Sequence, residues 1–151
     1  MNQDKIMKRK MMIAIIVCIL SLIGLFVFAG LYSNEKKNTQ RTYYNIYIKN
    51  MEEACDEVST YLQNGKDLEM HYNVLLSDVG TARNMIFELE NISEEKQKQV
   101  NTFYYCLVKY PAQMQARLDE IYTALDDVSA NLDKGYDELA QITESLDLLG
   151  N

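Results

Sequence analysis

The stretch MMIAIIVCILSLIGLFVFAGLY, residues 11–32, carries no charged side chain, and only Ser21, Gly24 and Gly30 interrupt its apolar character. Roughly 20 helical residues, each rising about 1.5 Å, cross a bilayer hydrocarbon core of about 30 Å. We therefore predict a transmembrane helix that begins at Met11, ends at Tyr32 and acts as a signal anchor. The lipid bilayer is then the first expected partner of the chain.

The residues before this stretch leave one alternative open. Lys5, Lys8, Arg9 and Lys10 are typical of the basic start of a secretory signal peptide, and residues 27–29 (VFA) offer a cleavage site. The apolar core of a signal peptide is usually about 7–15 residues long. The longer run in this chain favours retention as an anchor over cleavage.

The charges that flank the stretch predict its orientation. Residues 1–10 contain four basic residues and one acid, and residues 33–41 contain three basic residues and one acid. Cytoplasmic flanks are enriched in Lys and Arg. We therefore expect residues 1–10 to form a cytoplasmic tail and residues 33–151 to form an extracytoplasmic domain of a single-pass protein in the cell membrane.

The net charge changes sign along the chain. The formal charge of −7 divides into +5 for residues 1–41, −5 for residues 42–111 and −7 for residues 112–151. An acidic domain lacks the basic footprint that binding to nucleic-acid phosphates requires. The charge distribution therefore excludes nucleic acid as an expected partner.

Two amphipathic helices are predicted after the anchor. Apolar residues recur every three or four positions over about 42–63 and 68–90, which is the period of a helix with one buried face. Gly65 suits the left-handed end of the first helix, and Asp67 suits the N-cap of the second. Ser93, followed by two acids, suits the N-cap of a third helix.

The last segment, residues 94–149, keeps one apolar stripe over about seven heptads. Pro111 lies on this stripe, and an interior proline must kink or end a helix. Because the register continues past Pro111, we favour one kinked helix over a reversal of the chain. A narrow stripe of this length is typical of a coiled coil. The predicted fold is all-α, with a transmembrane helix followed by an antiparallel helical bundle or coiled coil.

The predicted interaction site is the C-terminal part of this stripe, because the two shorter helices cannot cover its whole length. We call it the heptad seam, which consists of Leu118, Ile121, Leu125, Val128, Leu132, Leu139, Ile142 and Leu146. We expect the seam to bind a second copy of the chain or another membrane or envelope protein. The expected function is that of a scaffold or adaptor.

The eleven tyrosines suggest an alternative function. A tyrosine buries its ring while its hydroxyl reaches water or a partner, which suits helix boundaries and interfaces, and Tyr104, Tyr105 and Tyr110 form one such cluster. A ligand-sensing four-helix domain would instead use a pocket between helices, lined by Tyr61, Tyr72 and Tyr104. Such a sensor would signal through a separate membrane partner.

The chain contains no recognisable catalytic set. His71 is its only histidine, and it has no H-E-x-x-H or C-x-x-C motif. For Cys55 and Cys106 we favour isolated thiols over the alternative, a disulfide formed in an oxidising compartment. We therefore predict that the protein is not an enzyme and has neither a metal site nor a cofactor.

Overall fold

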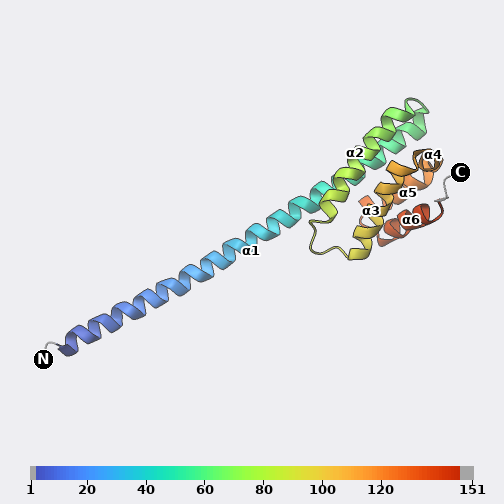
Figure 1. Ribbon diagram of the computed structural model, residues 1–151. Coiled ribbons are helices and arrows are strands. Elements are labelled where there is room, and N and C mark those ends of the chain that lie inside the picture. Colours follow the sequence, from blue (N-terminus) through green and yellow to red (C-terminus); the bar gives the residue numbers. More distant parts are fainter. Residues whose placement is uncertain (1–2, 147–151) are drawn as a thin grey trace. The chain divides into compact units, whose positions relative to one another are not determined.

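The computed structural model describes residues 3–146, which contain helices and no strand. Figure 1 shows these helices, labelled in chain order. Their bounds are α1 Gln3–Asn64, α2 Leu68–Ile86, α3 Glu94–Lys109, α4 Pro111–Gln115, α5 Leu118–Ser129 and α6 Asp133–Glu144. The prediction of an all-α fold is confirmed for the described residues.

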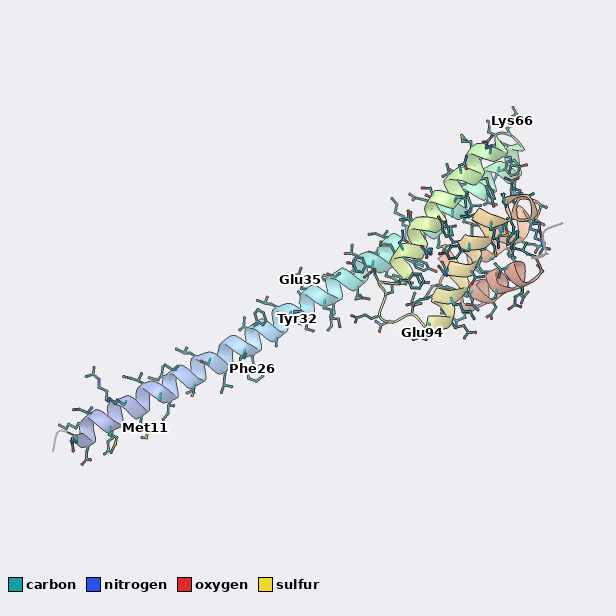
Figure 2. All side chains as sticks on the ribbon, in the orientation of Figure 1. Met11, Phe26, Tyr32, Glu35, Lys66 and Glu94 are labelled. Atoms are coloured by element: carbon teal, nitrogen blue, oxygen red, sulfur yellow. The ribbon has the colours of Figure 1, made fainter. Side chains whose placement is uncertain are left out.

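The chain divides into two compact units, Met1–Thr39 and Gln40–Asn151, which we call the anchor unit and the helical unit. In the anchor unit, apolar side chains such as Met11, Phe26 and Tyr32 project from α1 without covering neighbours (Figure 2). An 18-residue window of α1 has a mean hydropathy of 3.0, and none of it is buried inside the protein. By length and composition this helix suffices to cross a membrane, and a signal sequence meets the same criteria.

The predicted helix over 42–63 is the C-terminal part of α1, and no break separates it from the apolar stretch. Residues 33–41 (SNEKKNTQR) include no Gly or Pro to end a helix, and they include good helix formers such as Lys, Gln and Arg. The boundary between the two units therefore falls within a helix, after Thr39.

The turn between α1 and α2 follows the sequence pattern in part. Gly65 adopts the expected left-handed conformation, with φ 63°, and its N–H donates to the carbonyl oxygen of Tyr61 at 2.7 Å. Asp67 occupies the N-cap position of α2 at φ 55°, but its side chain makes no capping hydrogen bond. The sequence therefore predicts the site of the turn correctly and the side-chain cap incorrectly.

The start of α3 agrees with its sequence signal. The Ser93 side chain accepts a hydrogen bond from the backbone N–H of Lys96 at 3.3 Å, as an N-cap does. Glu94 and Glu95 lie in the first turn, where the helix dipole favours acids. In Figure 2, Glu94 lies at one end of the helical unit, and Lys66, in the α1–α2 turn, lies at the other.

The prediction of one helix over 94–149 is wrong: residues 94–146 form α3, α4, α5 and α6, and residues 147–149 lie outside the described part. Pro111 begins α4, where its missing N–H would have no helical partner in any case. Tyr110, the residue before it, leaves helical geometry with φ −124° and ψ 52°. The proline therefore ends α3 instead of kinking it.

The chain reverses direction across α4. Lys96, in the first turn of α3, pairs with Asp133, the first residue of α6. Arg117, just before α5, donates to Ser145, just after α6. Thus α6 runs parallel to α3 and antiparallel to α5, so α5 returns antiparallel to α3. The favoured kink at Pro111 is wrong, and the alternative of a reversal is confirmed.

A second reversal joins α5 to α6 through a Schellman motif. The N–H of Leu132 donates to the Asp127 carbonyl at 2.8 Å, and the N–H of Asn131 donates to the Val128 carbonyl at 2.9 Å. Asn131 is left-handed, with φ 60°. Asparagine tolerates this conformation better than most residues do. The motif therefore ends α5 and allows α6 to fold back against it.

The helical unit has one hydrophobic core, to which α2 to α6 and the second half of α1 contribute. Its largest fully buried side chains include those of Tyr47, Phe103, Met51, Leu75, Ile86, Leu107, Met114, Ile121, Leu125 and Leu139. Gly135 lies where α5 and α6 approach closely, because a Cβ atom there would lie 2.5 Å from the Val128 nitrogen. The unit therefore buries its helix faces against one another.

Candidate interaction surface

The heptad seam lies almost entirely inside the core of the chain itself. Seven of its eight side chains are buried, with relative exposures of 0–6%, and Leu132 alone is exposed, at 48%. The reversals at α4 and at Asn131 bring α5 and α6 together, and their stripes pack into the core that they share with the other helices of the unit. The described structure therefore leaves no continuous apolar seam for a partner, which corrects the sequence-based assignment of this surface.

The three tyrosines predicted to line a ligand pocket do not share one. Tyr61 and Tyr72 border a cavity of about 10 Å³, roughly the space of one water molecule. The Tyr72 hydroxyl is buried and donates to the Leu107 carbonyl at 2.7 Å, and burial raises its pKa. Tyr104 lies apart from this cavity, beside Gly80 and Arg83. The geometry therefore gives no support to the ligand-sensing alternative.

A different surface is formed where one stripe of α2 meets one stripe of α3. On α2 the stripe has the helical spacing i, i+3, i+4 and i+7, and the stripe on α3 has the same spacing. We call the two together the Arg83 surface, which consists of Gly80, Arg83 and Asn84 on α2, Phe87 at its C-cap, and Asn101, Tyr104, Tyr105 and Val108 on α3. The lack of a side chain at Gly80 lets Tyr104 approach, with one ring carbon 3.1 Å from the position that a Cβ atom would take.

Arg83 is the centre of this surface. Its guanidinium carbon lies 5.7 Å from the ring centre of Phe87, 5.6 Å from that of Tyr104 and 5.3 Å from that of Tyr105. Its Nε–H donates to the Asn101 Oδ1 atom at 2.7 Å. Cation–π contacts and this hydrogen bond hold the guanidinium in one orientation.

The charge of Arg83 is not neutralised within the described part of the chain. Its hydrogen bonds go to amide oxygens of Asn101 and Asn84, and none of the ion pairs among residues 3–146 includes it. Arg83 is therefore a cation without an acidic partner in the described structure.

Two of the three rings around Arg83 lie open to solvent. Among residues 40–146, six large hydrophobic residues are exposed, and three of them, Phe87 at 48%, Tyr105 at 54% and Val108 at 52%, belong to the Arg83 surface. Arginine and aromatic residues are enriched in protein interfaces and dominate their binding energy. An exposed, aromatic surface around an unpaired guanidinium is suited to binding a carboxylate on another protein.

The other polar clusters are structural. Lys134 pairs with Asp127 and Glu138 at 2.8 Å each, which raises the pKa of Lys134. The Tyr47 and Tyr136 hydroxyls share a buried hydrogen bond of 2.8 Å, and burial raises the pKa of both. These contacts join α5 to α6 and α1 to α6. Within residues 3–146, no group of three or more His, Cys, Asp or Glu side chains is placed to hold a metal ion.

The two cysteines of the helical unit are free and buried. The Cys55 thiol donates to the Tyr122 carbonyl at 3.7 Å. Burial, with nearby Asp126 and Asp56, raises the pKa of Cys55 to about 11, and burial also raises that of Cys106. Both thiols are therefore protonated and unreactive at neutral pH. Of the two alternatives predicted for them, the structure contains isolated thiols.

The sequence contained part of the signal for the Arg83 surface. The Tyr104–Tyr105 pair was recognisable as an interface cluster, but Arg83, Phe87 and Val108 lie off the apolar stripes that predict the core. Comparisons of the chain with protein-family models, with curated proteins and with solved structures find no match. The functional conclusion therefore depends on the geometry and chemistry of this surface.

Proposed function

We propose that the protein is a single-pass, membrane-anchored interaction protein without catalytic activity. The apolar stretch of residues 11–32 is the anchor, and the helical unit presents the Arg83 surface to a protein partner at the cell envelope. The N-terminal tail is cytoplasmic and the helical unit extracytoplasmic, in keeping with the basic residues before the anchor. The heptad seam, which is mostly internal, serves to fold the unit.

Two features support this role. The first is an apolar helix that no other part of the described chain covers. The second, which carries the proposal, is the exposed Arg83 surface, where a guanidinium without an acidic partner is surrounded by three rings. A guanidinium without an acidic partner can form charge-assisted hydrogen bonds with a carboxylate of another protein, and these bonds are stronger than those between neutral groups.

Site-specific photo-crosslinking tests this function. We expect a photoreactive amino acid at Tyr105, in the full chain expressed in cells, to give an adduct heavier than the monomer in the membrane fraction. The adduct forms because Tyr105 lies in the middle of the proposed interface. The measurement is an immunoblot of washed membranes after irradiation.

The same photoreactive residue at Lys49 is the control. Lys49 is exposed on α1 and pairs with Glu53, outside the Arg83 surface. We expect no adduct from this position. Equal adducts from both positions, or none from Tyr105, would contradict the assignment of the surface. Recovery of the full-length chain in the soluble fraction would contradict the anchor.

A further inference from the structure

The face formed by α5 and α6 has the chemistry that complements the Arg83 surface. Residues 118–144 contain eight acids and one base, Lys134. A groove of about 220 Å³ lies on this face, and its lining consists of Glu120, Thr123, Glu138, Gln141 and Ile142. The groove is smaller than the roughly 300–1,000 Å³ of small-molecule pockets. Its size suits an inserted side chain.

One carboxylate of this groove, that of Glu120, is available to a cation. Glu120 is exposed on α5 and belongs to none of the ion pairs among the described residues. The Oε1 atom of Glu138 binds Lys134 at 2.8 Å, whereas its Oε2 atom is buried without a hydrogen-bond partner in the described part of the chain. A buried carboxylate oxygen without a partner is uncommon and is stabilised by an added donor.

We propose that the partner of the Arg83 surface is a second copy of this chain, whose α5–α6 groove receives Arg83. This inference rests on the proposed membrane-anchored interaction function and names its partner. The guanidinium lies against Glu120 of the second copy, and the exposed rings of Phe87 and Tyr105 cover the ion pair. The contact supplies an acid for Arg83 and a base for Glu120, neither of which has an ion-pair partner in its own described chain.

This contact joins different surfaces of the two copies. The pair as a whole therefore keeps one free Arg83 surface, on one copy, and one free groove, on the other, so that association continues into a ring or an open row. Anchoring in one membrane raises the effective concentration of the copies. A modest interface is then sufficient for assembly, because the anchors have already confined the copies to one surface.

Charge reversal with rescue by mixing tests the inference. Full-length copies are labelled at the N-terminus with donor or acceptor dyes and reconstituted together in phosphatidylcholine vesicles, and energy transfer is measured as lipid is added. We expect Arg83→Glu and Glu120→Arg, each alone, to raise the apparent dissociation constant on the order of tenfold or more. A mixture of the two variants recovers transfer, because each pair then contains one acid and one arginine.

Two controls separate binding from folding. Lys49→Glu makes the same charge change away from both surfaces, and we expect wild-type energy transfer from it. Near-ultraviolet circular dichroism of the buried tyrosines confirms that each variant is folded. Glu120 is exposed on α5, so Glu120→Arg tests the contact even where Arg83→Glu disturbs the packing of α2 on α3.

Three results would overturn the inference: no concentration-dependent transfer for the wild type, unchanged transfer for folded Glu120→Arg, or no recovery on mixing. The last of these would mean that Arg83 and Glu120 do not meet. Adducts at Tyr105 to a different membrane protein, together with absent self-association, would reject the second copy as partner and leave the proposed function standing. Loss of the anchor would instead reject the proposed function.

Discussion

Replacement of Leu125 by Asp is expected to unfold the helical unit. The Leu125 side chain is fully buried between α5 and the rest of the core. Truncating such a leucine costs about 2–5 kcal/mol, and burying a carboxylate without a partner adds to this loss. The sum approaches the whole stability of a typical domain, about 5–15 kcal/mol. Urea titration of the detergent-solubilised chain, followed by near-ultraviolet circular dichroism, measures the effect.

Leu132→Asp is the matched control, because this seam residue is 48% exposed at the α5–α6 turn. We expect its free energy of unfolding to stay within about 0.5 kcal/mol of the wild type. If the heptad seam bound a partner, both substitutions would dissociate an oligomer and leave the monomer folded. That pattern would show that the stripe is not buried within one chain.

Gly135→Ala is expected to lower the free energy of unfolding by about 2 kcal/mol. The new Cβ atom would lie 2.5 Å from the Val128 nitrogen and 2.8 Å from the Ala124 carbonyl oxygen, which are backbone atoms of α5. Backbone atoms cannot turn aside, so α6 must move away from α5. The strain outweighs the gain of up to about 1 kcal/mol that alanine brings to a helix.

Gly80→Ala makes the same chemical change where the neighbour is flexible. Its Cβ atom would lie 3.1 Å from a ring carbon of Tyr104, a partly exposed side chain that is able to shift. We expect a free energy of unfolding within about 1 kcal/mol of the wild type. Equal destabilisation by both substitutions would indicate that the close α5–α6 approach is not real.

The sequence predicts most of the local structure in this chain. Residues 11–32 are uncharged over the length of a membrane span. Gly65 and Ser93 mark a helix end and a helix start because a left-handed residue and an N-cap have specific side-chain requirements. These signals are local, so one sequence contains all the information they need.

The connection of the last helices could not be predicted from their pattern. The apolar stripe continues in phase across Pro111 and Asn131, although the helices on either side are separate. A stripe marks the buried face of each helix, and it does not show whether neighbouring helices are continuous. Asn131 is a weaker turn signal than glycine, and its left-handed conformation depends on the Schellman hydrogen bonds. The Arg83 surface could not be predicted for a related reason. It forms where α2 packs on α3, and the apolar stripes of these helices identify only the residues that are buried in the core.

The anchor is the central claim of this account, and alkaline carbonate extraction combined with intact mass measurement tests it most directly. Cell membranes are washed at high pH, and the mass of the protein in the pellet and the supernatant is determined. We predict that the protein pellets with a mass that includes residues 11–32. Release into the supernatant of a chain that begins after Ala29 would show a cleaved signal peptide and contradict the claim.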